Sequence, residues 1–376
     1  MLTLTYTLAD QNPATTKSLG ILNLSLQLLK HLAAHPAVGA LTVFGNSVLA
    51  PRLRLPARAA LELHDEAAGG GARRALWDQW GLYAHAGRQP HEWLFLPKGF
   101  ASFVRGSPCK LAAVVADGMS DYYARHYPRG QSRLEHLYFT ASFKATLRQA
   151  QVLFAISDFT AAEIQRLADQ YRIPCPPVVT MGVGFEKPDT GTRPSPDAPE
   201  ILVLTSRFPH KRTDLALEYV ARFQAATRYP GAIHCVGSLP PGLAWPDRPG
   251  WHRHARLDEQ AYRALMARCG VLVYVSEYEG FGMPAVEAAL AGLAPVYSDI
   301  PALREVMLGT GCPFANASYD ALAAALERAV GTPPAQVAAW ADRLLAAHHW
   351  PAVTARVVKA LEMRSGATTP ARAPQT

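Results

Sequence analysis

The stretch VLVYVSEYEGFGMPAVEAALAG, residues 271–292, has the pattern of one complete strand–loop–helix unit. Residues 271–275 form an uninterrupted apolar run of the kind found in buried parallel strands. Pro284 and Gly292 then mark the two ends of a helix, because proline is favoured in the first helical turn and glycine just beyond the last. Such a unit is the building block of an α/β domain with a parallel sheet.

The start of this helix has no side chain that can cap it. Gly282 and Met283 lack a side-chain oxygen to accept hydrogen bonds from the first helical N–H groups. These donors lie at the positive end of the helix, and Gly280 and Gly282 let a ligand approach the backbone closely. The pattern therefore predicts that a phosphate group binds there.

Two carboxylates accompany the helix start. Glu279 lies in the loop, and Glu287 is expected in the first turn of the helix. Carboxylates accept hydrogen bonds from neighbouring hydroxyls, such as those of a ribose or a hexose. A ligand with a sugar at each end and phosphate in the middle would use all of these features. In the alternative interpretation, Glu287 only complements the helix dipole and Glu279 is a solvated loop residue.

A second strand is followed by a basic loop. Residues 201–205 predict a buried strand, and Thr213 is expected to cap the next helix. Three cations lie between them: Arg207, Lys211 and Arg212. Arginine can hold a diphosphate with two N–H groups at once, whereas lysine acts as a point charge. The alternative is an ordinary solvated basic turn.

Strand-type and helix-type segments alternate along the 376 residues, which predicts two α/β domains. A segment rich in proline, aspartate and threonine, residues 186–199, is expected to link them. The remaining expected parts are an N-terminal Rossmann-like domain over 1–185, a C-terminal one over 200–350, a helix over 351–364 that packs back toward the N-terminal domain, and a disordered tail over 365–376. Because ligands of such folds bind at the carboxyl ends of strands, we expect the site in a cleft between the domains.

Composition narrows the class of protein. No stretch approaches the roughly 20 consecutive apolar residues of a membrane-spanning helix, and the N-terminus does not resemble a signal peptide, so we expect a cytoplasmic protein. The five cysteines form no C-x-x-C pair, which predicts free thiols. The net charge of +7 favours anionic substrates or peripheral contact with the inner membrane surface, or it has no special purpose. The sequence has no dense basic run of the kind that binds nucleic acid. His252 and His254 have no third metal ligand spaced nearby, so the sequence does not favour a metal site there.

Residues 200–310 closely resemble the retaining glycosyltransferases of family 4, which have the GT-B fold of two Rossmann-like domains. The family signature Glu-Gly-Phe-Gly-x-Pro-x-x-Glu is matched by residues 279–287. SRFPHKRTD at 206–214 and DIPALREV at 299–306 also match the family. A weaker resemblance extends over 91–181. Taken together, these matches imply a GT-B glycosyltransferase whose two domains face each other across a cleft.

The resemblance gives each matching residue a role. Arg207 and Lys211 would hold the donor diphosphate, Glu279 would contact hydroxyls of the transferred sugar, and Glu287 would bind the ribose hydroxyls. Backbone amides would contact donor sugar and phosphate at four positions, namely Gly280, Phe281, Gly282 and Met283. No metal is expected, because the cations and the helix terminus neutralise the leaving diphosphate.

The N-terminal half departs from the family pattern at two points. Where the family has a Gly-Gly turn after the first strand, residues 17–21 read KSLGI, with Gly20 as the single glycine. Where the family has a His-Asp pair at the end of a strand, this chain has Ala116 and Asp117. Gly20 is still expected to bind the donor, and Asp117 to belong to the catalytic set. Alanine cannot make the hydrogen bond of the histidine, which leaves three alternatives. Another residue makes this contact, the donor sugar lacks the group that the histidine would contact, or activity is weak or lost.

The preferred hypothesis is transfer of a hexose, with retention, from a nucleoside diphosphate sugar to a glycan or lipid-linked glycan hydroxyl in bacterial surface polysaccharide or lipopolysaccharide biosynthesis. The sequence PHKRTD at 209–214 resembles that of mannosyl- and rhamnosyl-transferring members, which favours a GDP-sugar such as GDP-mannose as donor and no cofactor besides this substrate. The alternative is a catalytically weak, nucleotide-sugar-binding scaffold or regulator of a polysaccharide assembly complex. A dehydrogenase would need G-x-G-x-x-G after a strand, and the sequence has none.

Overall fold

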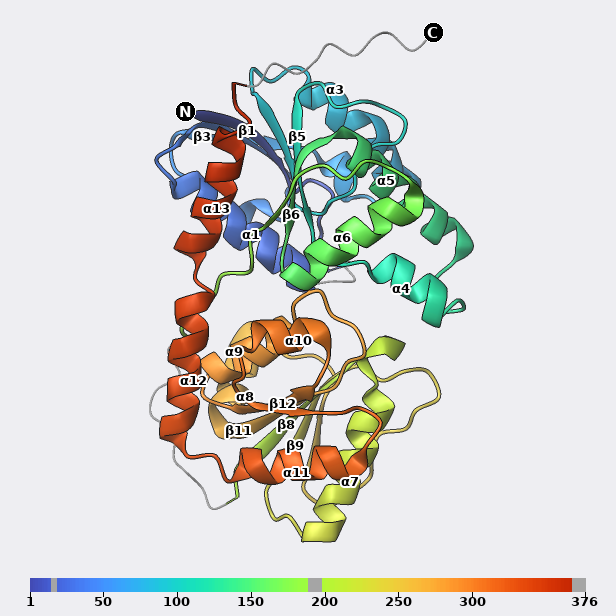
Figure 1. Cartoon of the computed structure of the whole chain (residues 1–376), viewed down its shortest axis with the longest axis vertical. Coiled ribbons are helices and arrows are strands. Elements are labelled where there is room, and N and C mark those ends of the chain that lie inside the picture. The colour runs from blue at the N-terminus through green and yellow to red at the C-terminus, as the bar shows by residue number, and fades with distance from the viewer. Residues whose placement is uncertain (15–18, 189–197, 367–376) are drawn as a thin grey trace. The chain divides into compact units, whose positions relative to one another are not determined.

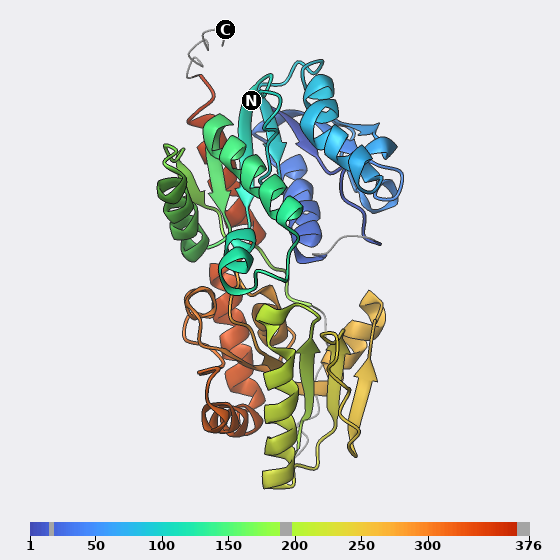
Figure 2. The same cartoon turned by 90° about the vertical axis from the view of Figure 1, so that its right-hand side faces the viewer.

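The computed structural model describes residues 1–14, 19–188 and 198–366, which form two compact units (Figures 1 and 2). The first unit contains residues 1–124, 131–184 and the C-terminal segment from Trp350, and the second contains 125–130 and 185–349. Most of the expected linker, most of the expected tail, and Lys17 and Ser18 of the segment before Gly20 lie outside the described residues.

The first unit is built on a seven-stranded parallel sheet with the order β3-β2-β1-β4-β5-β6-β7. Its strands are β1 (Leu2–Thr7), β2 (Val38–Gly45), β3 (Ala59–Leu63), β4 (Trp93–Leu96), β5 (Lys110–Val115), β6 (Ala150–Ala155) and β7 (Val178–Thr180). The chain order reverses between β1 and β4, so the topological switch point of this doubly wound sheet lies between these two strands.

Helices cover both faces of this sheet because successive strand residues point to opposite sides. On β4, Leu94 and Leu96 join a core with α3 (Leu82–Ala86), α5 (Arg133–Gln149) and α6 (Asp158–Tyr171). On the other face, Phe95 stacks between Tyr6 and Phe154. The further helical segments of this unit are η1 (Ala50–Arg52), η2 (Asp65–Ala68), α2 (Ala72–Leu76), the π-helical turn η3 (Trp77–Gly81) and α4 (Met119–His126).

The end of the chain belongs to the first unit. Helix α13 (Trp350–Glu362) packs against α1 (Leu19–Ala34), which Figure 1 shows beside it. Beyond the helix, Ser365 Oγ accepts a hydrogen bond of 3.0 Å from Trp93 Nε1, although a disordered tail was expected from this residue. None of the helices in the described part of the chain is long and apolar enough to cross a membrane.

The second unit repeats this design with a six-stranded parallel sheet in the order β10-β9-β8-β11-β12-β13. Its strands are β8 (Glu200–Thr205), β9 (Ile233–Gly237), β10 (Trp251–His254), β11 (Cys269–Tyr274), β12 (Ala294–Ser298) and β13 (Cys312–Phe314). Its helical segments are η4 (Pro209–Lys211), α7 (Thr213–Thr227), α8 (Glu259–Arg268), α9 (Met283–Leu290), α10 (Pro301–Val306), α11 (Tyr319–Val330) and α12 (Pro334–Ala347). The switch point lies between β8 and β11.

The predicted fold class, two α/β domains with Rossmann-like parallel sheets, is confirmed. Three strands were not predicted, β3, β10 and β13. All three lie at a sheet edge, and β13 has only three residues. Leu61 and Leu63 of β3 are exposed, and three of the four residues of β10 are His252, Arg253 and His254. Strands of this kind lack the continuous apolar run of a central strand, and they form because a neighbouring strand is present to pair with them.

Gly282 is required by the packing of α9 against α10. It precedes α9 in a left-handed conformation with φ 93°. A Cβ atom there would lie 2.2 Å from Leu303 Cδ2 of α10. The packing of the fold therefore requires a glycine at the helix start, whether or not a ligand approaches there.

Replacement of this glycine tests the constraint. We expect Gly282→Ala to lower the free energy of unfolding by about 2–5 kcal/mol, from the left-handed backbone and from overpacking against Leu303. Gly242, with φ 83° and no atom within 4 Å of the added methyl, provides the matched control. Gly242→Ala should cost only about 1–2 kcal/mol. Equal losses for the two variants in urea unfolding would show that the contact with Leu303 imposes no constraint.

Candidate functional site

The two loops that flank the switch point of the second sheet are tied together. The backbone N–H of Glu277, after β11, donates to the carbonyl of His210, after β8, at 2.7 Å. Ser276 anchors the same loop near the ends of two further strands: its N–H donates to Ser298 Oγ, at the end of β12, at 2.8 Å, and its carbonyl accepts from Asn316 Nδ2, just after β13, at 2.8 Å. The loops therefore form one braced platform at the carboxyl ends of the central strands.

Thr213 closes the loop after β8 and does not cap the helix that follows, as the sequence predicted it would. Thr213 was expected to cap α7, whereas it is the first residue of that helix and Arg212 precedes it in a left-handed conformation. Its hydroxyl instead accepts from the N–H of Ser206 and donates to the carbonyl of Ser206, both at 2.8 Å. Residues 207–212 are thereby held as a short loop, with Arg207 exposed and Lys211 largely buried.

Lys211, Tyr274 and Glu279 form a compact, buried cluster. Lys211 Nζ donates to Tyr274 Oη at 2.7 Å and forms an ion pair with Glu279 Oε1. Tyr274 Oη donates to the same oxygen at 2.5 Å. Glu279 is 9% exposed, and no described residue donates to its other oxygen, Oε2. Lys211 has three N–H groups, so one remains for a ligand beside these two contacts.

The protonation states of this cluster follow from its burial and charges. Burial alone would raise the pKa of Glu279, but the charge of Lys211 and the hydrogen bonds from Lys211 and Tyr274 lower that pKa below its usual value. Burial, and then the charge of Glu279, raise the pKa of Tyr274. Burial, and then the charge of Lys211, lower the pKa of the neighbouring His210 to about 4. At neutral pH the cluster therefore contains an ionised Glu279, a Tyr274 that can donate, and an uncharged His210.

The loop leads from this cluster into the uncapped start of α9. Gly282 occupies the N-cap position and no side chain caps the helix, as the sequence predicts. Phe281 is buried, and its ring lies 5.9 Å from Phe185 and 5.3 Å from His348. The phenyl ring thus anchors the loop, while the side chain of Met283 at the helix start is only partly buried.

Glu287 is the fifth residue of α9, one position further along than expected, because the helix begins at Met283 and not at Pro284. Its side chain is exposed to solvent, yet nearby protein removes part of its hydration and raises its pKa. Its charge contributes, after burial, to the raised pKa of Tyr262 on α8, so the two side chains are close. No described residue forms a hydrogen bond or an ion pair with the Glu287 carboxylate. It is therefore available to a ligand.

Two residues of the sequence-predicted site lie in the first unit. Gly20 is the second residue of α1 and is partly buried. Asp117 follows β5, and its Oδ1 accepts from the N–H of Met119 at the start of α4, at 3.0 Å. Ala116, in the position of the family's histidine, accepts at its carbonyl from Thr160 Oγ1 at 3.3 Å. These three residues follow strands of the first sheet at its carboxyl edge, and their roles in a site stay predictions.

The sequence reasoning missed Tyr274 and Glu277. Tyr274 was counted only as a buried strand residue, although a lone hydroxyl at the carboxyl end of a buried strand is a signal in itself. Glu277 accepts from Arg212 Nη1 at 2.7 Å across the two loops. Arg212 also pairs with Asp214, which removes it from the candidate diphosphate ligands, whereas no described carboxylate pairs with Arg207.

Two groups among the described residues are close enough to hold a metal ion: Glu62, His64 and His85, and Glu200, His234 and Cys269. The second group explains the histidines of β10, because His252 and His254 lie beside His234, which the sequence did not connect with them. His234 contacts Glu200 through one ring nitrogen at 3.0 Å and His254 through the other at 3.1 Å. Glu200 and Cys269 begin their strands, so this group lies at the edge opposite the two loops.

Comparison with known proteins places the second unit in context. Residues 199–331 match the family described as "Glycosyl transferases group 1". The O-antigen chain mannosyltransferase B of Escherichia coli is 25% identical over 218 residues, which cover 53% of this chain and 55% of that protein. A GDP-mannose:cellobiosyl-diphosphopolyprenol alpha-mannosyltransferase of Xanthomonas oryzae pv. oryzae (strain PXO99A) is 51% identical over 43 residues, or 11% of each chain. The matches thus span about half and about a tenth of these curated relatives.

Solved structures resemble the whole chain. WaaG, a glycosyltransferase involved in lipopolysaccharide biosynthesis, matches with a TM-score of 0.66 and 17% identity over 96% of this chain and 100% of that one. A sucrose-phosphate synthase from Thermosynechococcus elongatus matches with a TM-score of 0.71 and 15% identity over 98% of this chain and 100% of that one. At these identities the likeness shows the fold, which is GT-B.

The hydroxyl of Tyr274 can be tested separately from its ring. We expect Tyr274→Phe to lower the free energy of unfolding by about 1.5–3 kcal/mol, because the buried Lys211–Glu279 pair loses a hydrogen bond to a charged group. Tyr262→Phe is the control, since no described residue hydrogen-bonds to that hydroxyl. Urea unfolding of both variants provides the measurement, and equal stability of Tyr274→Phe and wild type would contradict the role given to this hydroxyl.

Proposed function

We propose, on the premise that residues 199–331 match the group 1 glycosyltransferases, that the protein is a retaining glycosyltransferase. It transfers a hexose from a nucleoside diphosphate sugar to a hydroxyl of a glycan or lipid-linked glycan. One observation carries the proposal: the buried cluster of Lys211, Tyr274 and Glu279 adjoins an uncapped helix start at the switch point of a doubly wound sheet.

Each part of the donor has a matching group in the second unit. Several groups suit the diphosphate: the guanidinium of Arg207, with which no described carboxylate pairs, the remaining N–H of Lys211, and the amides of Gly280, Phe281, Gly282 and Met283. Oε2 of Glu279 suits a hydroxyl of the transferred hexose, because Oε1 already accepts two hydrogen bonds. The accessible carboxylate of Glu287 suits the ribose hydroxyls.

The proposed reaction uses this arrangement. The bond between C1 of the hexose and the diphosphate oxygen breaks, and the diphosphate leaves with the electron pair. Arg207, Lys211 and the positive end of α9 stabilise the developing charge. The acceptor oxygen forms its bond to C1 on the face that the leaving group vacates, and its proton passes to a diphosphate oxygen, as the family resemblance implies.

We further propose GDP-mannose as the donor and bacterial surface polysaccharide or lipopolysaccharide as the context. Two relatives are named mannosyltransferases, and the name of one contains GDP-mannose. The PHKRTD sequence at 209–214 favours the same donor type. The five free cysteines suit a cytoplasmic location, and the net charge of +7 suits peripheral contact with an anionic inner membrane surface.

The second candidate function is a scaffold that binds a nucleotide sugar without turning it over. Ala116 favours it, because the methyl group of alanine cannot make the polar contact of the family's histidine. Tight donor binding in calorimetry, with no turnover on a panel of acceptors, would decide for this candidate against the enzyme.

The donor-binding residues can be tested by substitution. We expect Glu287→Ala to raise KM for the donor about tenfold or more, through loss of hydrogen bonds to a charged group. We expect Lys211→Ala to lower kcat by about 10²–10³, the scale for loss of one group that stabilises developing negative charge. Glu327→Ala, on an exposed position of α11, is the control. Transfer and donor hydrolysis are measured, with circular dichroism to check folding. Equal activity of all variants and wild type would refute the assignment.

The donor base can be identified without knowledge of the acceptor. A thermal-shift screen of the chain against GDP, UDP, dTDP and ADP should show the largest rise in melting temperature with GDP, because a ligand that binds only the native state stabilises it by mass action. The shift should shrink in Glu287→Ala. A larger rise with UDP, dTDP or ADP would reject GDP as the base, and no rise with any of them would count against a nucleotide-sugar donor.

A further inference from the structure

The first unit contains a pocket at the switch point of its own sheet. Its volume is 350 Å³, within the range of roughly 300–1,000 Å³ that is typical of small-molecule sites. Thr7 and Asp10 reach it from the end of β1, and Pro97 and Lys98 from the end of β4. Ligands of doubly wound folds bind where the strand order reverses, so the pocket lies where a ligand is expected.

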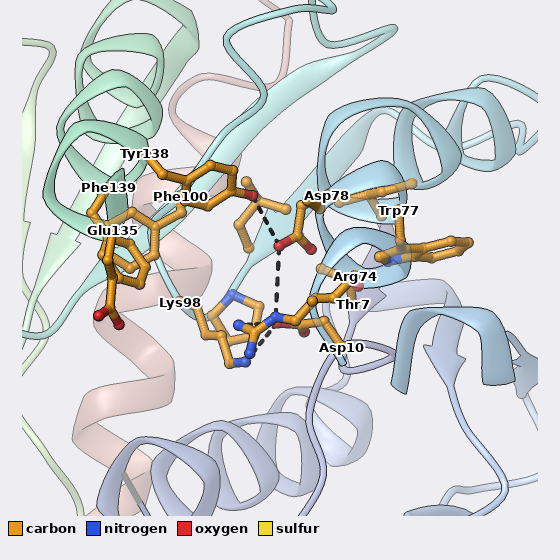
Figure 3. A pocket seen from close by; sticks show the side chains of 15 residues that line it. Thr7, Asp10, Arg74, Trp77, Asp78, Lys98, Phe100, Glu135, Tyr138 and Phe139 are labelled. Carbon is orange, nitrogen blue, oxygen red and sulfur yellow. Dashed lines mark hydrogen bonds and ion pairs between the residues drawn. The ribbon is translucent and has the colours of Figure 1, made fainter. Parts of the chain in front are cut away.

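The charged side chains of this pocket hold one another in a fixed array (Figure 3). Lys98 Nζ donates to Asp10 Oδ2 at 2.5 Å, and Arg74 Nη2 donates to the same oxygen at 3.2 Å. Arg74 Nε lies 3.7 Å from Asp78 Oδ2, to which Tyr138 Oη also donates at 3.2 Å. Both cations of the described lining are therefore already matched by carboxylates.

This balance of charge favours an uncharged ligand. Among the described residues that line the pocket, Glu135 is a third carboxylate beside the two cations. A phosphate or carboxylate ligand would have to displace Asp10 or Asp78 from Arg74 or Lys98, at the cost of a like-charge contact. A hydroxyl group, which both donates and accepts hydrogen bonds, fits such an array without displacement.

Some polar atoms of the lining have no partner. Thr7 is 6% exposed and Trp77 is 2% exposed, and among the described residues neither Thr7 Oγ1 nor Trp77 Nε1 has a hydrogen-bond partner. Buried polar atoms are normally paired, so such atoms beside a pocket point to a polar ligand. Burial, and then the charge of Asp10, raise the pKa of Asp78 to about 7. Near neutral pH, Asp78 can therefore accept a hydrogen bond as an ionised carboxylate and donate one as a protonated carboxyl group.

One wall of the pocket is aromatic. The rings of Phe100 and Phe139 lie 5.0 Å apart, and that of Tyr138 lies 5.8 Å from Phe139. Phe100 is exposed although it is a large apolar side chain. Aromatic faces opposite a few fixed polar groups suit a pyranose, which has apolar C–H faces and a rim of hydroxyls.

We propose that this pocket binds a neutral sugar unit of the acceptor, and that Thr7, Asp78 and Tyr138 contact its hydroxyls. The assignment of this sugar to the acceptor rests on the proposed function. The binding of a neutral glycoside by the first unit does not, because every described residue that lines the pocket belongs to that unit.

Saturation-transfer NMR on the full chain tests the proposal directly. The neutral probes are methyl α-mannoside, methyl α-rhamnoside, methyl α-glucoside and methyl β-galactoside, and the anionic probes are mannose 6-phosphate and glucuronate. We expect at least one neutral glycoside to bind, and to bind more tightly than either anion. No binding by any neutral glycoside, or tighter binding by an anion, would overturn the proposal.

Two variants locate the binding. Asp78→Asn removes one negative charge from the array and Tyr138→Phe removes one hydroxyl, so each should weaken the best neutral probe by about tenfold. Asp78→Asn should also improve binding of mannose 6-phosphate, because Arg74 loses a partner. Asp169→Asn, at an exposed position of α6 outside the pocket, is the control. Unchanged binding in both pocket variants would place the sugar elsewhere and refute the assignment.

Calorimetry of GDP binding to the same proteins separates this proposal from the proposed function. The pocket variants should bind GDP like wild type, because the residues assigned to the donor lie in the second unit, and this also shows that they fold. If wild type binds a neutral glycoside but not GDP, the result counts against the donor site alone. If wild type binds GDP but no neutral glycoside, the result counts against the pocket alone.

Discussion

The buried ion pair between Lys211 and Glu279 is the interaction on which the proposed site depends. A pair of charges removed from water is stable only if both partners are held and their remaining hydrogen bonds are satisfied. Tyr274 supplies one of these bonds, and the braced loops after β8 and β11 hold the two partners together. The loops can meet only because β8 and β11 are neighbours at the switch point of the sheet.

The two sheets use the same backbone arrangement for different chemistry. In each, the loops of the two strands at the switch point bring a lysine and a carboxylate together: Lys98 with Asp10 in the first, and Lys211 with Glu279 in the second. In the second unit no described carboxylate pairs with Arg207, and no side chain caps the start of α9, which together suit an anion. In the first, carboxylates match both cations of the pocket, which suits hydroxyls.

The loop between β11 and α9 shows how one short segment meets structural and functional demands together. The ring of Phe281 is buried and anchors the loop, and Gly282 is forced by the contact with Leu303. These constraints fix the backbone, and the uncapped N–H groups at the start of α9 are a consequence of that fixed backbone. A motif that is identified by its residues is therefore also a packing unit, and part of its composition reflects the fold.

The sequence alone determined the fold class, the central strands and the uncapped helix start, because these depend on local patterns: continuous apolar runs, a proline, a glycine and the lack of a capping oxygen. The sequence did not predict the edge strands β3, β10 and β13, because these strands form by pairing with a neighbour. Only the tertiary structure decided that Lys211 pairs with Glu279 and Tyr274, and that Asp10, Arg74, Asp78 and Lys98 share one pocket. Residues as far as 88 positions apart meet there because parallel strands bring their carboxyl ends to one edge, which no local pattern encodes.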